Sequence, residues 1–309
     1  MINGRTELIA HLGYPTETFT APMIYNPWFA SRGINAVVVP MGVQAEDYAA
    51  FLRPLFRLSN IRGALVTMPH KVATVGLLDG AAVAVRVAGS CNAILRRPDG
   101  ALYGDLFDGI GFVRGAKRKG FDFTGADCLI VGAGGVGSAI AAAIAAEGPG
   151  SIALFDIRAA AAQSLAGRLR RHFPGVTVCL RDNDPAGYRL VVNATPLGMS
   201  AGDPPPFDPA RLDGQAFVGD VVLTAELSPL LKAAARRGCR YQVGTDMLFE
   251  QIPAYLEFFG FGTATPNELR MVILRACSKM EPPQMHLSSP VGRRYRSLAP
   301  TQRCRAGLL

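Results

Sequence analysis

Short apolar runs alternate with amphipathic segments through the first hundred residues of the chain. Three of the runs have the length and composition of buried strands, and these are residues 8–11, 36–39 and 63–66. Apolar residues recur at helical spacing from Ala45 to Arg57, which predicts a helix. Pro22 is well placed to open an earlier helix, which Pro27 is expected to interrupt or kink. Residues 92–95 and 101–103 flank the turn Pro98-Asp99-Gly100 and predict a β-hairpin.

The alternation continues from about residue 120 to 244, where apolar runs predict six strands. These are residues 128–131, 152–155, 176–180, 190–193, 217–222 and 241–243. Alternating strands and helices predict an α/β fold with mainly parallel sheets, and the repetition in this segment is typical of a doubly wound sheet. Residues 247–259 and 268–279 follow as two further helices. A chain of 309 residues suits two such domains.

Apolar residues make up 49% of the chain and charged residues 18%, which indicates a folded protein and excludes a disordered one. The chain has no run of about 18 apolar residues, so we expect no membrane span. Its first residues lack the basic start and apolar stretch of a signal peptide. The six cysteines form no Cys-x-x-Cys pair, which favours buried, inert thiols over disulfides or zinc. We therefore expect a cytoplasmic protein without a metal.

The formal net charge of +8 raises the question of an anionic partner. Much of the excess lies in residues 280–309, a segment that is rich in arginine and also holds four prolines. We interpret this segment as a solvated, poorly ordered tail, with a weak contact to an anionic surface as the alternative. We expect no nucleic-acid or membrane partner, and a monomer or a homodimer.

A Gly-x-Gly-x-x-Gly sequence follows the apolar run 128–131 and opens an Ala-rich helix expected at 138–146. This strand–loop–helix context is the one that dinucleotide binding requires. The glycines allow a tight turn and close approach of the backbone to a pyrophosphate, and free N–H groups of the helix meet the phosphates. The pattern predicts a Rossmann-type NAD(P)-binding domain whose loop consists of Gly132, Gly134, Gly135, Val136 and Gly137 with Ala133.

Asp156 ends the next predicted strand and is the candidate for choosing between the two dinucleotides. A carboxylate at this point accepts hydrogen bonds from the adenosine ribose hydroxyls and repels the 2′-phosphate of NADP. Arg158 complicates the prediction, since a guanidinium could bind that phosphate. We predict NAD, with NADP as the alternative. The two residues could also be an ordinary surface pair.

Further motifs follow one another in a fixed order along the chain. They are Gly13-Tyr14-Pro15, Val66-Thr67-Met68-Pro69-His70-Lys71, Gly89-Ser90-Cys91-Asn92, Gly104-Asp105-Leu106-Phe107-Asp108-Gly109, Asn193-Ala194-Thr195-Pro196-Leu197-Gly198-Met199, Ser228-Pro229-Leu230 and Met247-Leu248-Phe249-Glu250-Gln251. With these motifs and the glycine loop, residues 8 to about 279 resemble the shikimate dehydrogenase family. The resemblance implies an NAD(P)-dependent oxidoreductase that acts on a secondary alcohol of a cyclic hydroxy compound, shikimate or quinate by analogy, in aromatic amino acid biosynthesis.

The resemblance also implies a catalytic pair, Lys71 and Asp108. A lysine can hydrogen-bond the reacting hydroxyl and shuttle its proton, while an aspartate orients the lysine and balances its charge. From the residues alone, a surface lysine and an N-capping aspartate explain the pair equally well, and capping is an added role for Asp108. His70, at a usually aromatic position, is expected to pack. The implied domains are residues 1–112, completed by helices in 245–279, and residues 113–244.

The implied substrate contacts are Thr67, Asn92 and Gln251, and the implied further cofactor contacts are Thr195 and Pro196. A turn residue and a helix-surface residue are the alternatives for Asn92 and Gln251. The family carries two serines before a proline whose hydroxyls bind the substrate carboxylate. Phe19 and Ala21 stand there, and Thr18 and Thr20 could replace them only if the register shifts by one. Further family pocket positions, two asparagines and a tyrosine, are taken by Leu65, Leu106 and Leu223.

These departures predict that shikimate binds poorly and that the pocket takes a less polar substrate. Two other functions compete with a dehydrogenase. A non-catalytic NAD-binding sensor would keep the fold, but retention of both Lys71 and Asp108 argues against it, and turnover of any alcohol with NAD would separate the two. Nucleic-acid binding through residues 280–309 would be decided by a filter-binding assay with and without that segment.

Overall fold

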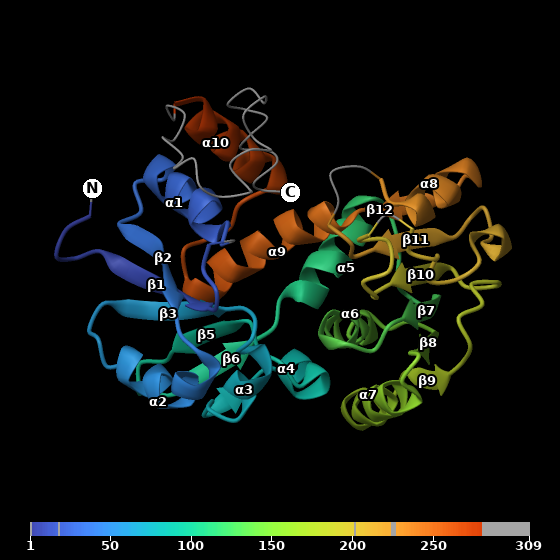
Figure 1. The fold of residues 1–309 in the computed structure, drawn as a ribbon, viewed down its shortest axis with the longest axis horizontal. Coiled ribbons are helices and arrows are strands. Elements are labelled where there is room, and N and C mark those ends of the chain that lie inside the picture. Colours follow the sequence, from blue (N-terminus) through green and yellow to red (C-terminus); the bar gives the residue numbers. More distant parts are fainter. Residues whose placement is uncertain (1, 18, 201, 224–226, 280–309) are drawn as a thin grey trace.

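The computed structural model describes residues 2–17, 19–200, 202–223 and 227–279. Two six-stranded sheets lie side by side, with helices α5 (Asp108–Arg118) and α9 (Gly244–Phe259) running between them (Figure 1). The two-sheet α/β fold predicted from the alternating pattern is therefore confirmed. Thr18 and the segment 280–309, with its predicted disorder, lie outside the described residues.

The first sheet has the strand order β2-β1-β3-β5-β6-β4. Its strands are β1 (Glu7–Gly13), β2 (Ala36–Gly42), β3 (Ile61–Val66), β4 (Gly80–Ala81), β5 (Ala93–Arg96) and β6 (Leu102–Asp105). Its helices are α1 (Ala21–Ser31), α2 (Ala45–Leu55), α3 (Lys71–Val75) and α4 (Val83–Ala88). The predicted hairpin is the antiparallel pair β5–β6, and β5 is also antiparallel to β3, so this sheet is mixed.

Helix α1 was expected to be interrupted or kinked at Pro27, and it is not interrupted. It is continuous from Ala21 to Ser31, with Pro22 in its first turn as predicted but with Pro27 inside it. Proline removes one backbone hydrogen bond and normally interrupts a helix. Its apolar face packs against the first sheet through Tyr25, Trp28 and Phe29, each at most 4% exposed. Burial of this face offsets the missing bond, because tertiary packing supplies most of the stability of a protein helix.

The second sheet is wholly parallel, with the strand order β12-β11-β10-β7-β8-β9 of a doubly wound fold. Its strands are β7 (Asp127–Val131), β8 (Ser151–Phe155), β9 (Thr177–Leu180), β10 (Leu190–Asn193), β11 (Phe217–Asp220) and β12 (Arg240–Gln242). Its helices are α6 (Gly135–Ala145), α7 (Ala159–His172), α8 (Pro229–Arg236) and the 3-10 turn η1 (Pro209–Arg211). All six strands were predicted, although β11 ends two residues before the predicted end.

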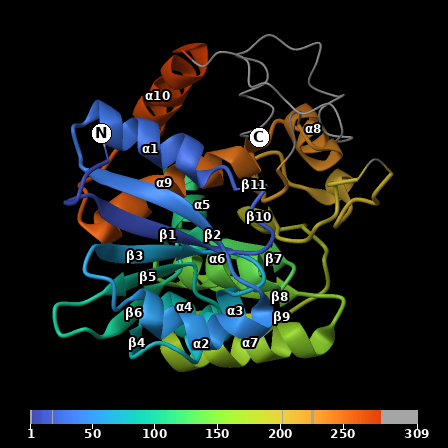
Figure 2. The ribbon, with the colours of Figure 1, turned by 60° about the vertical axis from the view of Figure 1, so that its left-hand side comes forward.

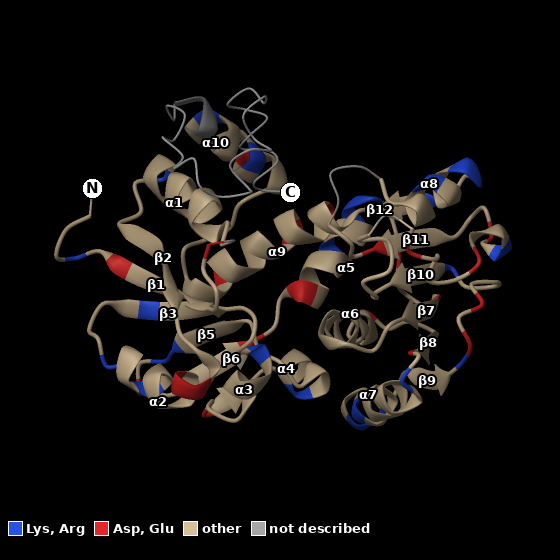
Figure 3. Cartoon of the chain, viewed as in Figure 1, with Lys and Arg blue, Asp and Glu red and all other residues tan. Residues whose placement is uncertain are grey.

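Apolar residues cover both faces of each sheet. Helices α1 and α9 pack on one face of the first sheet, and α2 and α4 pack on the other. Helix α10 (Pro266–Lys279) packs on α1 and α9. Helices α6 and α7 cover the face of the second sheet that is turned toward α4, and α8 covers the far face (Figure 2). Most strand positions are uncharged, although several strands carry one charged residue, such as Glu7 in β1 and Arg62 in β3. Most other charged residues lie on loops and on helices (Figure 3). No described helix has the length and apolar character needed to cross a membrane.

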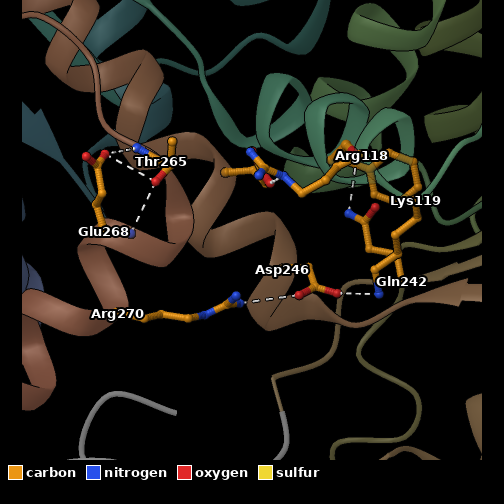
Figure 4. Close-up of polar contacts among 9 residues, drawn as sticks. Arg118, Lys119, Gln242, Asp246, Thr265, Glu268 and Arg270 are labelled. Atoms are coloured by element: carbon orange, nitrogen blue, oxygen red, sulfur yellow. Dashed lines mark hydrogen bonds and ion pairs between the residues drawn. The ribbon is translucent and has the colours of Figure 1, made fainter.

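Ion pairs join α9 to its neighbours at the end of α5. Asp246, in the first turn of α9, lies 2.7 Å from Lys119 Nζ and 3.3 Å from Arg270 of α10 (Figure 4). Helix α10 begins with a reciprocal cap, in which Thr265 N donates to Glu268 and Glu268 N donates to Thr265 Oγ1. These contacts connect α9 to both α5 and α10, so the residues that α9 presents to the first sheet are held in place.

Candidate active site

Lys71 and Asp108 lie at the starts of two helices that face each other beside the first sheet. Lys71 is the first residue of α3 and Asp108 is the first residue of α5. Lys71 Nζ donates to Asp108 Oδ2 over 2.9 Å, and their side chains are 28% and 12% exposed. The pair is partly screened from water, so each charge depends on the other for compensation. The structure thus brings together the two residues that the resemblance paired.

The capping role expected for Asp108 is not observed. Helix α5 has Phe107 at its N-cap position, and no side chain there accepts a hydrogen bond from the first turn. The carboxylate of Asp108 instead receives the Lys71 ammonium. A charged partner at 2.9 Å outweighs a cap because charge-assisted hydrogen bonds are about twice as strong as neutral ones.

Both residues line a cavity of about 190 Å³ between β1, β3, α1 and α9. Its walls are partly apolar and partly made of uncharged polar side chains. The full set is His11, Thr20, Ala21, Ile24, Tyr25, Leu65, Val66, Thr67, Lys71, Asp108, Leu248, Gln251, Ile252 and Tyr255. A small concave site with a few convergent polar groups is typical of a ligand pocket.

Of the three predicted substrate contacts, two line this cavity and one does not. Thr67 and Gln251 line it, and the buried Oε1 of Gln251 has no hydrogen-bond partner among the described residues. Asn92 is 1% exposed and does not line the cavity, but its Oδ1 accepts from the backbone N–H of Phe107, next to Asp108. The Nδ2 of Asn92 is likewise buried without a partner. Unpaired buried polar atoms are costly, and a bound ligand is one way to satisfy them.

Only some of the positions that depart from the family pattern reach the cavity. Thr20, Ala21 and Leu65 line it, whereas the ring of Phe19 lies behind it, stacked on His11. Leu106 is 1% exposed within the core beside α4, and Leu223 is 45% exposed on the surface. The apolar character of the pocket therefore does not come from Leu106 or Leu223.

His70 packs, as expected, and does not face the cavity. Its ring stacks on Tyr48 with a centroid separation of 3.9 Å, and Nε2 is 2.8 Å from the carbonyl of Val43. Burial lowers the pKa of His70 more than the bond to Val43 raises it. The ring fixes the turn that ends in Lys71.

The glycine-rich loop lies at the carboxyl edge of the second sheet. In the register of this sheet, the last residues of three neighbouring strands lie side by side: Val131 of β7, Phe155 of β8 and Asn193 of β10. The loops that follow these strands therefore lie at the same carboxyl edge. Gly134 and Gly135 face open space, with no atom within 4 Å of an added Cβ. The N-terminal N–H groups of α6 start at the same point. The loop has the open, donor-lined shape that a dinucleotide pyrophosphate requires.

Asp156 supports this loop from the end of β8. Its carboxylate accepts from the backbone N–H groups of Ala133 and Arg158, both over 2.8 Å. Burial raises the pKa of Asp156, but these backbone hydrogen bonds and the Arg158 guanidinium at 3.6 Å lower it further, so the net shift is downward. A negative charge is therefore fixed at the end of β8, beside the glycine-rich loop.

Thr195 and Pro196 follow β10 at the same edge. The Thr195 hydroxyl donates to Asn193 Oδ1 over 2.7 Å and accepts from the N–H of Leu197, so it shapes this turn. Pro196 is exposed beside it. Thr195 therefore lies next to the glycine loop, with its Cγ2 3.0 Å from an added Cβ on Gly132.

Four of the cysteines are free thiols in the described part of the chain. Cys91, Cys128, Cys179 and Cys239 are free, and burial raises the pKa of Cys91 and Cys128 to about 12. Thiols with such pKa values are unreactive. Within the described ranges no group of three or more His, Cys, Asp or Glu side chains could hold a metal ion.

Sequence reasoning missed three polar residues of the cavity, His11, Tyr25 and Tyr255. His11 is the one polar side chain in the otherwise apolar run from Leu8 to Leu12, and that interruption was the available signal. Register places His11 beside Leu65 of β3, so the two side chains share the face of the sheet that lines the cavity. The two tyrosines gave no signal, because aromatic residues on amphipathic helices are most often core.

Comparisons with known proteins agree with this architecture. Residues 12–94 match the model of the shikimate dehydrogenase substrate binding domain. The NADP(+)-dependent shikimate dehydrogenase of Rubrobacter xylanophilus is 35% identical over 254 residues, which cover 81% of this chain and 89% of that protein.

Solved structures give the same result. Shikimate 5-dehydrogenase of Listeria monocytogenes, in complex with shikimate and NAD, superposes with a TM-score of 0.82 at 26% identity, over 88% of this chain and 98% of that one. Quinate dehydrogenase of Corynebacterium glutamicum, in complex with NAD, has a TM-score of 0.78 at 28% identity, over 87% and 99%.

The fold and site together define a class of α/β proteins. Its members have a sheet of the dinucleotide-binding type beside a pocket that holds a Lys–Asp pair. Within that class, the chain belongs to the shikimate dehydrogenase family. The resemblance seen in the sequence is therefore confirmed.

Proposed function

We propose that this protein is an NAD(P)-dependent oxidoreductase that interconverts a secondary alcohol and a ketone on a cyclic hydroxy compound. The observation that carries the proposal is the Lys71–Asp108 pair, 2.9 Å apart on the wall of a ligand-sized cavity. The names of the relatives, which are shikimate and quinate dehydrogenases, support the same class of reaction. The test is formation of NADH or NADPH from a panel of cyclic alcohols that includes shikimate and quinate.

The chain's own groups account for the proton in this reaction. Oxidation of a secondary alcohol removes a proton from oxygen as a hydride leaves carbon, and a bound nicotinamide supplies the hydride acceptor. Lys71 would hydrogen-bond the substrate hydroxyl and hold its proton, and it would return that proton in the reverse direction. Asp108 keeps Lys71 oriented and balances its charge. Thr67 and Gln251 would orient the ring, since both line the cavity and Oε1 of Gln251 is buried without a partner among the described residues. Asn92 would act through the backbone of Phe107, whose N–H its Oδ1 accepts.

The proposal includes an arrangement of domains. Residues 1–112 with the helices in 245–279 would form the substrate domain, and 113–244 the dinucleotide domain, with the boundary inside α5. Packing of α9 and α10 against α1 and β1 supports this division. The free described cysteines support a cytoplasmic location, and we propose a monomer or a homodimer.

We propose NAD as the preferred dinucleotide and expect Asp156→Ala to shift the preference toward NADP. Removing the fixed negative charge relieves its repulsion of a 2′-phosphate, and a change of about 1.4 kcal/mol would move the ratio of kcat/KM values tenfold. Asp156→Asn is the control, because it drops the charge but keeps an oxygen for the N–H of Ala133. The measurement is kcat/KM for NAD and NADP. A wild-type enzyme that clearly prefers NADP would refute the assignment.

We expect the double variant Phe19→Ser/Ala21→Ser to gain activity on shikimate. Two hydroxyls would return to the family's carboxylate-binding positions, and a hydrogen bond to a charged group contributes roughly 1.5–3 kcal/mol. Two such bonds correspond to roughly a hundred- to ten-thousandfold increase in kcat/KM for shikimate. We expect only part of this increase, because Leu65 still lines the cavity. Ala30→Ser, on the exposed side of α1, is the control for an added hydroxyl. A micromolar KM for shikimate in the wild type would show that Thr20 and Thr18 bind the carboxylate instead.

A further inference from the structure

His11 places an imidazole in the wall of the candidate pocket. It stands in β1, and its ring stacks on Phe19 with a centroid separation of 4.1 Å and an interplanar angle of 29°. It lines the same cavity as Lys71 and Asp108. Nδ1 is buried without a hydrogen-bond partner among the described residues. An apolar side chain could pack against Phe19 equally well, so packing alone does not explain a histidine at this position.

Phe19 holds this ring in place. An added Cβ on Gly13 would lie 2.6 Å from Phe19 Cζ, so the phenyl ring packs directly over the backbone at the end of β1. The imidazole of His11 is therefore packed between β1 and the ring of Phe19, and this packing restricts its orientation. Fixed groups bind ligands more tightly because little conformational entropy is lost on binding.

The pocket offers no uncompensated positive charge. Lys71 and Asp108 are its charged residues, and they neutralise each other. Burial lowers the pKa of His11 to about 4, so its imidazole is uncharged at neutral pH. Burial also raises the pKa of Tyr25 and of Tyr255, whose hydroxyls stay protonated. Thr20, Thr67 and Gln251 add only neutral groups.

A carboxylate in this pocket would lose its hydration without gaining either a free cation or the two serine hydroxyls that Phe19 and Ala21 replace. A buried charge without such compensation is costly. Hydroxyl and carbonyl groups can instead exchange water for the neutral donors and acceptors of His11, the two tyrosines, the two threonines and Gln251. Ala21, Ile24, Leu65, Leu248 and Ile252 provide the apolar surface that ring carbons need.

We infer that the substrate is an uncharged cyclic alcohol, without a carboxylate, and that His11 is the specificity-determining residue that hydrogen-bonds a ring hydroxyl. This inference rests on the proposed function and names the substrate class of that same site. Phe19 acts through His11 as a positioning residue. His11 thus provides a polar contact close to the place where the family binds a carboxylate.

Matched ligands test the charge of the substrate. Shikimate and shikimate methyl ester share one ring and its hydroxyls and differ in the carboxylate, as do quinate and its methyl ester. We expect kcat/KM at least about tenfold higher for each ester than for its acid. Equal or better turnover of the acids would overturn the inference. If neither acids nor esters are oxidised with NAD or NADP, the proposed function fails, and calorimetric binding of ester and acid then still decides the preference for an uncharged ligand.

Variants test the role of His11. His11→Leu should raise KM for the methyl ester about three- to tenfold, the loss expected for one neutral hydrogen bond, with little change in kcat. His11→Gln keeps a hydrogen-bonding group and should recover part of that loss. The Tm of each variant shows whether it folds. A KM that is unchanged in folded His11→Leu contradicts the role of His11. A KM for shikimate that falls steeply from pH 8 to pH 6, and loses that dependence in His11→Gln, would show that the site binds carboxylates by protonating His11, and would overturn the inference.

Discussion

Replacing Lys71 with alanine is expected to lower kcat by about a hundred- to ten-thousandfold, the usual contribution of a general acid–base group. The change removes the ammonium that lies 2.9 Å from Asp108 and leaves that carboxylate without its cation. Dinucleotide affinity should stay nearly unchanged, because Lys71 lines the pocket of the first sheet while the glycine-rich loop belongs to the second. Steady-state kinetics on any alcohol that the wild type oxidises measures kcat, and fluorescence titration measures dinucleotide affinity.

Two further variants make this result specific. Asp108→Asn keeps the shape of the side chain but removes its charge, so it should also be impaired. Lys117→Ala is the matched control, since it breaks another lysine–carboxylate pair on α5, with Glu147, away from the cavity. It should leave kcat unchanged. Near-normal turnover in Lys71→Ala would mean that this pair does not move the proton.

Most strands were predictable because they are runs of apolar residues buried between layers of helices, whereas the two-residue strand β4 (Gly80–Ala81) was not predicted. Residues 128–131, for example, are all at most 2% exposed between two layers of helices. The ends of elements were less predictable, because polar contacts set them. β11 ends at Asp220, whose carboxylate accepts from the N–H of Val222 and from Ser228, so the apolar Val221 and Val222 lie beyond the strand.

The pocket was only partly predictable, because it is formed by elements distant in sequence. Lys71, Asp108, Thr67 and Gln251 could be named from motifs, but nothing local showed that His11 would lie on the same cavity. Strand alternation assigns a residue to a face, and only the packing of α1 and α9 over that face determines whether it meets core or cavity. The same limit explains Leu106, whose side chain enters the core beside α4.

Gly137→Ala should weaken dinucleotide binding by about a hundredfold and destabilise the fold by about 1–3 kcal/mol, the usual cost of overpacking. A Cβ at this position would lie 2.0 Å from the carbonyl oxygen of Gly132 and 3.2 Å from the Cβ of Ala194. Neither contact can be relieved by rotating a side chain, because the first is with backbone. The start of α6 must therefore move away from β7, and the loop at Gly132 moves with it.

Gly167→Ala, in α7 and outside the glycine-rich loop, is the matched control for this effect. Gly167 lies in the interior of α7, and nothing stands within 4 Å of an added Cβ. Alanine should therefore leave the fold intact and stabilise the helix slightly, since glycine in a helix costs roughly 0.5–1 kcal/mol relative to alanine. Thermal unfolding and NAD titration of both variants distinguish the two causes. A Gly137→Ala protein with the Tm and NAD affinity of the wild type would show that α6 and β7 need not approach as closely as the glycine permits.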